Sequence, residues 1–224
     1  MTQILVYGDS LSWGIVPNTR RRLAFTARWP GVLEIELCAA GHRVRVIEDC
    51  LNGRRTVWDD PFKPGRNGLV GLAQRIEVNS PLALVVLMLG TNDFQVMHPH
   101  DAWLSAQGTV TLVRAIRGAP IEPGMPVPEI LIVAPPPIAA AKGTIAAKFS
   151  GGDVKCRGLA DALAQIAREE RCAFFDAASV VSSSPHDGVH LDAEQHAQLG
   201  RALARAVQQT FATLLADGDG GDGV

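Results

Sequence analysis

Near the start of the chain stands the stretch Ile4-Leu5-Val6-Tyr7-Gly8-Asp9-Ser10-Leu11-Ser12-Trp13-Gly14. Its first three residues are apolar and lead into Gly8 and Asp9, a pattern that predicts a buried strand ending in a tight turn. Ser10 therefore follows the carboxyl end of the first predicted strand, the edge at which open α/β sheets bind ligands. A Gly-Asp-Ser turn is also an ordinary polar turn, so the remainder of the chain must decide whether Ser10 has a chemical role.

The rest of the sequence alternates between strand and helix patterns. Further strands are predicted at 43–50, 82–89, 130–134 and 172–175, and helices at 28–40, 69–78, 101–118, 154–171 and from 192 onward. The continuous apolar run 82–89 is typical of a central strand buried on both faces, whereas 43–50 alternates charged and apolar residues and should lie nearer an edge. Five strands without hairpins predict an α/β fold with a five-stranded parallel sheet between two layers of helices.

Two connections, 51–68 and 120–128, are longer than the predicted sheet requires. Turn residues fill 51–68, which we expect to cross the top of the sheet as a loop. Four prolines make 120–128 a stiff projecting segment, and the alanine-rich 139–152 is predicted to form a part-helical flap. We expect residues 1–216 to form a single domain and the Gly-Asp-rich residues 217–224 to form a flexible tail.

Composition excludes several classes of protein. The 224 residues suffice for one substantial core, and a net charge of −2 argues against a general affinity for nucleic acid. No apolar run approaches the roughly 20 residues that span a membrane, and the N-terminus has no signal-peptide pattern, so a cytoplasmic location is expected. The four cysteines lack metal-site spacing and are predicted to be reduced thiols. A nucleotide or flavin module is disfavoured because no glycine-rich phosphate loop is present.

Four polar stretches are predicted to meet at one edge of the sheet. They are Gly8-Asp9-Ser10, Asn52-Gly53, Gly90-Thr91-Asn92-Asp93 and Asp187-Gly188-Val189-His190. Ester hydrolysis requires a nucleophile, a base, a group that orients the base, and donors for a negative oxygen. Ser10 would be the nucleophile, His190 the base and Asp187 the orienting carboxylate. The backbone N–H groups of Ser10 and Gly53 and the side-chain amide of Asn92 would form the oxyanion hole.

Each of these residues also has a simpler explanation. Gly53 is consistent with a turn glycine, Asn92 with a helix cap, and His190 with a surface residue before a helix. The agreement of four stretches, in this order and each at a predicted strand end, favours the chemical interpretation.

The four stretches resemble the conserved blocks of the SGNH (GDSL) hydrolase family across nearly the whole chain. This resemblance implies a flavodoxin-like three-layer fold, a Ser-His-Asp triad that needs no metal or other cofactor, and activity on esters or thioesters. By position Ser10, Gly53, Asn92 and His190 match the four letters of the family name, and Asp187 matches the triad acid.

A closer resemblance is to the arylesterase and acyltransferase branch of that family. It is carried by Gly8-Asp9-Ser10-Leu11-Ser12-Trp13-Gly14, Arg28-Trp29-Pro30-Gly31-Val32-Leu33, Met88-Leu89-Gly90-Thr91-Asn92-Asp93 and Ala134-Pro135-Pro136-Pro137. The branch implies small acyl esters as substrates, transfer of the acyl group to alcohols or peroxide in some members, and assembly into homo-oligomers. The chain departs from the branch at 94–97 and 139–147, where the substrate pocket is expected.

We therefore expect a serine esterase that acts on small short-chain acyl or aryl esters. The alternative within the family is a deacetylase of acetylated oligosaccharides. The residues predicted to line an apolar substrate pocket are Trp13, Phe94, Ile145 and Phe149.

Overall fold

The computed structural model describes residues 1–217 and contains one sheet of five parallel strands. The strands are β1 (Thr2–Gly8), β2 (Val44–Cys50), β3 (Leu84–Met88), β4 (Glu129–Ala134) and β5 (Ala173–Asp176). Their order is β2-β1-β3-β4-β5, with every neighbouring pair parallel. The predicted α/β fold is confirmed, and so are the central place of the 82–89 strand and the edge place of the 43–50 strand.

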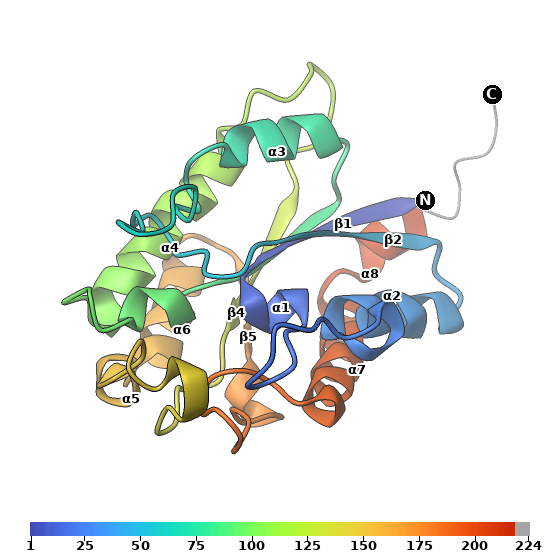
Figure 1. Ribbon diagram of the computed structural model, residues 1–224. Coiled ribbons are helices and arrows are strands. Elements are labelled where there is room, and N and C mark those ends of the chain that lie inside the picture. Colours follow the sequence, from blue (N-terminus) through green and yellow to red (C-terminus); the bar gives the residue numbers. More distant parts are fainter. Residues whose placement is uncertain (218–224) are drawn as a thin grey trace.

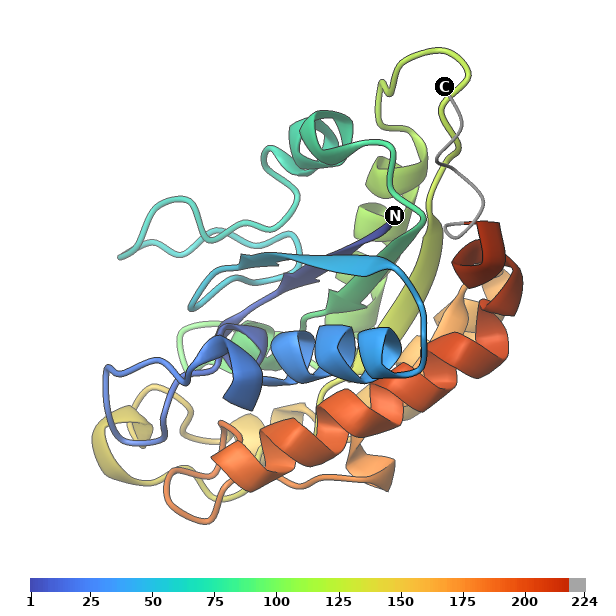
Figure 2. The same ribbon diagram turned by 90° about the vertical axis from the view of Figure 1, so that its right-hand side faces the viewer.

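Helices cover both faces of the sheet. They are α1 (Ser10–Trp13), α2 (Trp29–Ala39), α3 (Leu72–Asn79), α4 (Ala102–Arg117), α5 (Gly152–Lys155), α6 (Leu159–Glu169), α7 (Ala193–Thr210) and α8 (Ala212–Asp217). Figures 1 and 2 show α2 and α7 together on one side of the sheet and α3, α4 and α6 on the other. None of the helices within residues 1–217 combines the length and the apolar character needed to cross a membrane.

The two faces of the sheet bury two separate apolar clusters. Successive side chains of a strand point to opposite faces, so Leu5 and Tyr7 of β1 pack with α3, α4 and α6. Ile4 and Val6 pack with α2 and α7. The strands β1 and β3 are buried on both faces, which explains why their sequences are continuously apolar rather than alternating.

The structure corrects the helix predicted at 154–171. This segment forms two helices, α5 and α6, which are separated at Gly158 with φ +83°. A left-handed backbone of this kind ends a helix and is readily adopted by glycine alone. The predicted apolar face, including Leu163 and Ile166, is nevertheless buried on α6.

The last predicted helix also differs in its extent. It begins as expected, with Asp192 and Gln195 forming a reciprocal capping box. Phe211, with φ −121° and ψ +33°, then ends α7, so Phe211 and Leu214 of the predicted stripe lie beyond that helix. Both still pack against the α2–α7 cluster. Of the tail predicted at 217–224, residues 218–224 lie outside the described part of the chain.

Candidate active site

The carboxyl ends of the strands bring the four polar stretches to one cavity of about 100 Å³. Its lining includes the five residues that the sequence predicts for catalysis, Ser10, Gly53, Asn92, Asp187 and His190. They come from the start of α1, the loop after β2, the turn after β3 and the loop before α7. Segments that are distant in the sequence therefore face the same space.

Ser10 is the first residue of α1, which starts directly beyond β1. Asp9 caps this helix, because its Oδ1 accepts a hydrogen bond from the backbone N–H of Leu11 at 2.9 Å. As the first helical residue, Ser10 has an N–H that no carbonyl of its own helix can accept. The Ser10 hydroxyl lies 3.1 Å from Nε2 of His190.

The other nitrogen of the His190 ring faces Asp187. Nδ1 lies 2.7 Å from Oδ2 of Asp187, while Oδ1 accepts the backbone N–H groups of Val189 and His190, each at 2.9 Å. Burial raises the pKa of Asp187, but the hydrogen bonds and positive charge of His190 and the N–H of Val189 outweigh it and lower this pKa to about 2. The ionised carboxylate accepts a hydrogen bond from the Nδ1–H group, which favours the tautomer whose Nε2 is free to accept the proton of Ser10.

Two further groups can donate hydrogen bonds into the cavity. Gly53 has φ +84°, and within residues 1–217 no acceptor takes its backbone N–H. The Asn92 side chain is oriented because its Oδ1 accepts from Nε2 of Gln95 at 2.7 Å. Its Nδ2 donates to Oδ2 of Asp9 at 2.9 Å and, over a longer 3.2 Å, to the carbonyl of Arg54.

A buried ion pair supports Asn92 from behind. Arg55, fully buried, donates from Nη2 to Oε1 of Gln95 at 2.6 Å and pairs through Nη1 with Asp60 at 2.8 Å. Sequence reasoning missed this chain of contacts. Sequence reasoning predicts that an arginine in a turn-rich loop is exposed to solvent. No local sequence pattern distinguishes an arginine that becomes buried in the fold.

Two buried carboxylates also accept hydrogen bonds at the site. Burial raises the pKa of Asp9 to about 6, although the Leu11 N–H, His190 and Asn92 lower it in part. Burial likewise raises the pKa of Asp93 to about 6. Asp93 accepts the backbone N–H and hydroxyl of Thr56 and the hydroxyl of Ser105, and so joins the 51–68 loop to α4.

The structure places the four residues predicted to line the substrate pocket in different surroundings. Ile145 and Phe149 line the cavity that contains Ser10. Trp13 does not line it, because its half-buried ring packs against the guanidinium of Arg22 at 4.9 Å.

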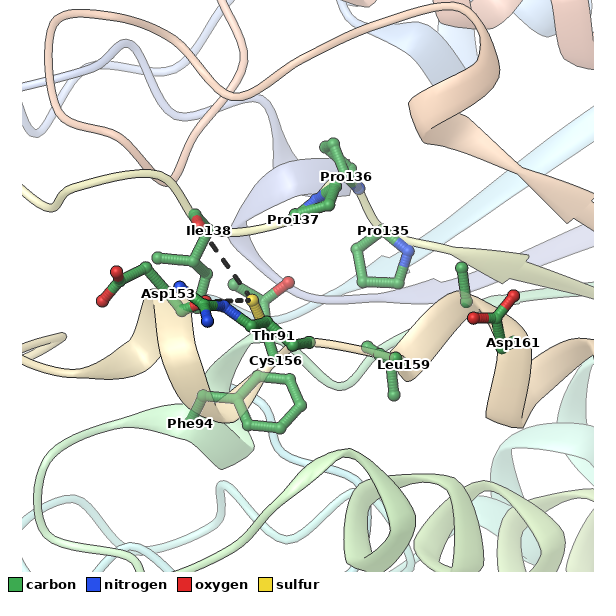
Figure 3. A pocket seen from close by; sticks show the side chains of 13 residues that line it. Thr91, Phe94, Pro135, Pro136, Pro137, Ile138, Asp153, Cys156, Leu159 and Asp161 are labelled. Atoms are coloured by element: carbon green, nitrogen blue, oxygen red, sulfur yellow. Dashed lines mark hydrogen bonds between the residues drawn. The ribbon is translucent and has the colours of Figure 1, made fainter.

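Phe94 faces a second cavity, of about 290 Å³, which Figure 3 shows between Pro135, Cys156 and Leu159. Asn92 and Phe94 belong to one 3-10 turn, Thr91–Phe94. With three residues per turn, side chains two positions apart point in different directions. Phe94 therefore lines a different cavity from the one that contains Ser10, and its role in binding substrate stays a prediction.

The side-chain types that bind metals are also present among the described residues. Within residues 1–217, no three His, Cys, Asp or Glu side chains are grouped so that they could hold an ion. All four cysteines are free thiols.

The fold and the site define a three-layer α/β protein with a serine, a histidine and an aspartate in hydrogen-bond contact at the carboxyl edge of its sheet. The chain belongs to the GDSL-like lipase/acylhydrolase family, whose model matches residues 6–198. Membership makes it a carboxylic ester hydrolase of the GDSL type.

Solved structures support this assignment over nearly the full length. The chain is similar to the native aryl esterase of M. smegmatis, with 36% identity, a TM-score of 0.88, and coverage of 93% of this chain and 99% of that one. It is also similar to a carbohydrate acetylesterase family member from Sinorhizobium meliloti, with 37% identity, a TM-score of 0.88, and coverage of 96% and 100%. Est24, a carbohydrate acetylesterase from Sinorhizobium meliloti, matches at 32% identity and a TM-score of 0.87, with coverage of 93% and 99%. No curated protein matches the sequence.

Proposed function

We propose that this chain is a serine esterase that hydrolyses small carboxylic esters, with short-chain acyl or aryl groups, through an acyl-enzyme on Ser10. The observation that carries the proposal is the pair of contacts made by His190, 3.1 Å to the Ser10 hydroxyl and 2.7 Å to the Asp187 carboxylate. A base within hydrogen-bond reach of a nucleophile, itself oriented by a third group, is the arrangement that activates serine.

The reaction follows from these contacts. His190 Nε2 takes the hydroxyl proton as Ser10 Oγ attacks the carbonyl carbon, and the carbonyl oxygen becomes negative. The N–H groups of Ser10 and Gly53 and the amide of Asn92 stabilise that oxygen, each contributing about 3 kcal/mol in the transition state. The leaving alcohol takes the proton from His190, and a water molecule deprotonated by His190 then releases the acid from Ser10.

The dimensions of the site favour a small acyl group. About 100 Å³ is well below the roughly 300–1,000 Å³ of typical ligand pockets. Ile145 and Phe149 supply apolar surface beside Ser10, which suits an acetyl or other short chain.

Turnover of p-nitrophenyl acetate by the wild-type protein and by Ser10→Ala tests this proposal. We expect the variant to lose roughly four orders of magnitude or more in kcat, with unchanged far-UV circular dichroism. A fluorophosphonate probe should label Ser10 in the wild type only. Equal rates in the two proteins would refute the proposed mechanism.

A second candidate is the removal of acetyl groups from carbohydrates, supported by the likeness to structures described as carbohydrate acetylesterases. Comparison of kcat/KM for acetylated xylooligosaccharides and for phenyl acetate separates the two. A higher value for the oligosaccharides would favour deacetylation as the main activity.

Acyl transfer and assembly are further proposals on this chain. Transfer requires an alcohol or peroxide to compete with water for the acyl-enzyme, and the ratio of transfer to hydrolysis in dilute alcohol measures that competition. The proposal of assembly into homo-oligomers rests on the loop 51–68 and on the segment 120–128, and Figure 1 shows the latter projecting beyond the amino-terminal end of β4. Light scattering at micromolar concentration would test it, since a single-chain mass contradicts assembly.

A further inference from the structure

The cavity that contains Ser10 has a positively charged lining, although the whole chain carries a net charge of −2. Arg20, Lys63 and Lys148 line it, and all three side chains are exposed to solvent. They come from three separate segments, namely the loop after α1, the 51–68 loop and the turns before α5. The one carboxylate in the lining, Asp187, is already bound by His190.

These three positive charges have no carboxylate in direct contact in the described part of the chain. Within residues 1–217, none of the three forms an ion pair with a carboxylate. The negative charge of Asp60 raises the pKa of both lysines, but this carboxylate is itself paired with Arg55 at 2.8 Å. The Lys148 ammonium instead lies 5.9 Å from the ring centre of Phe149, which also lines the cavity.

Partial burial and neighbouring positive charges disfavour the charged form of both lysines. Burial lowers the pKa of Lys63, and the positive charges of Arg66 and Arg20 lower it further. Burial lowers the pKa of Lys148, with Arg55, Lys63 and Arg20 adding to this effect. An anion placed among these groups would relieve their repulsion, as a neutral ligand would not.

We propose that the natural substrate is a small ester bearing an anionic group, a carboxylate or a phosphate, which Arg20, Lys63 and Lys148 bind while the ester carbonyl lies at Ser10. This inference rests on the proposed esterase function and adds to it the charge of the substrate. A cavity of about 100 Å³ accommodates only a short group, so the charged part of the substrate extends towards solvent, to which all three cations are exposed.

The test compares matched esters that differ in one charge. On the alcohol side the pair is 3-acetoxybenzoate and its methyl ester; on the acyl side it is mono-4-nitrophenyl adipate and its methyl ester. For each pair, kcat/KM of the anionic ester is divided by kcat/KM of the neutral ester. The result is then divided by the ratio of the rate constants with which hydroxide hydrolyses the same two esters. We call this corrected value the ratio. We expect this ratio to exceed one in at least one pair, and that pair shows which part of the substrate carries the charge.

Removal of the cations should lower the ratio. Arg20→Gln, Lys63→Gln and Lys148→Gln are each expected to reduce it about two- to fivefold, and the triple variant by about tenfold or more. Arg205→Gln, an exposed cation on α7, is the matched control and should leave the ratio unchanged. In the wild type, raising the salt from about 20 mM to about 500 mM should lower the ratio as well, because exposed charges are screened.

The two proposals fail in different ways. The proposal of an anionic substrate is overturned if, for both pairs, the ratio is the same in the wild type and the triple variant and does not change with salt. In that case Ser10-dependent hydrolysis still persists. Turnover of the neutral esters that is equal in wild type and Ser10→Ala overturns the esterase mechanism itself.

Discussion

The imidazole of His190 lies 3.1 Å from the hydroxyl of Ser10, although 180 residues separate them in the chain. The loop that carries the imidazole is fixed by its own hydrogen bonds. The backbone N–H of Ser184 donates to the carbonyl of His190 at 2.7 Å, and the Ser184 hydroxyl donates to Asp192 at 2.9 Å. The end of β1 and the start of α7 are therefore held at a defined separation.

Asp187→Asn should abolish most activity without unfolding the protein. An amide in place of the carboxylate can donate to Nδ1, which stabilises the tautomer that cannot accept the Ser10 proton. We expect kcat for p-nitrophenyl acetate to fall by about 10⁴. Asp161→Asn, at an exposed position on α6, is the control. An unchanged kcat in Asp187→Asn would contradict the role assigned to this carboxylate.

Asn92→Ala should lower kcat by about 10²–10³ because one oxyanion donor is lost. Gln95→Ala removes the donor that orients Asn92, and we expect a smaller fall in kcat, about tenfold, with KM nearly unchanged. Steady-state kinetics on one acetate ester measure both parameters. If Gln95→Ala changed KM and left kcat intact, its proposed role in positioning Asn92 would be wrong.

Asp9→Asn should stabilise the folded protein at neutral pH. The pKa of Asp9 is about 6 when folded, against 3.8 for the free side chain, so the folded protein binds this proton more tightly. The free energy of unfolding of the wild type therefore decreases by up to about 3 kcal/mol as the pH rises from 3.8 to about 6. Asparagine retains one oxygen that can cap α1 and carries no charge. It loses the second acceptor, which binds Nδ2 of Asn92, and this loss of about 1 kcal/mol does not depend on pH.

Urea unfolding at several pH values measures this difference. The free energy of unfolding of Asp9→Asn should exceed that of the wild type above pH 6, and the gap should close towards pH 4. Glu122→Gln, in the exposed 120–128 segment, is the matched control and should show no such dependence. A gap that is constant with pH would show that the charge of Asp9 is not its cause.

Ile145→Ala should shift the acyl-chain preference of the enzyme. Its side chain lines the small cavity beside Ser10, and truncation creates room for a longer chain. Each additional buried methylene is worth about 0.8 kcal/mol, or roughly fourfold in kcat/KM. A p-nitrophenyl ester series from acetate to hexanoate measures the shift. The same preference in variant and wild type would place the acyl group elsewhere.

The sequence alone determined the five strands, their alternation with helices and the order of the four polar stretches. These features depend on local periodicity and on turn residues at strand ends, both of which can be read from short segments. It also predicted that the 82–89 strand lies inside the sheet, because a continuously apolar sequence is typical of a strand buried on both faces.

Tertiary structure alone decided what surrounds those stretches. The packing of loops over the sheet decides three features. Arg55 is buried behind Asn92, Phe94 lines a second cavity, and Lys63 and Lys148 line the same cavity as Ser10. Loop packing is set by contacts between residues far apart in the chain, such as the hydrogen bond from Thr56 to Asp93. No local pattern encodes such contacts, so the charge and shape of the cavity emerge only from the folded chain.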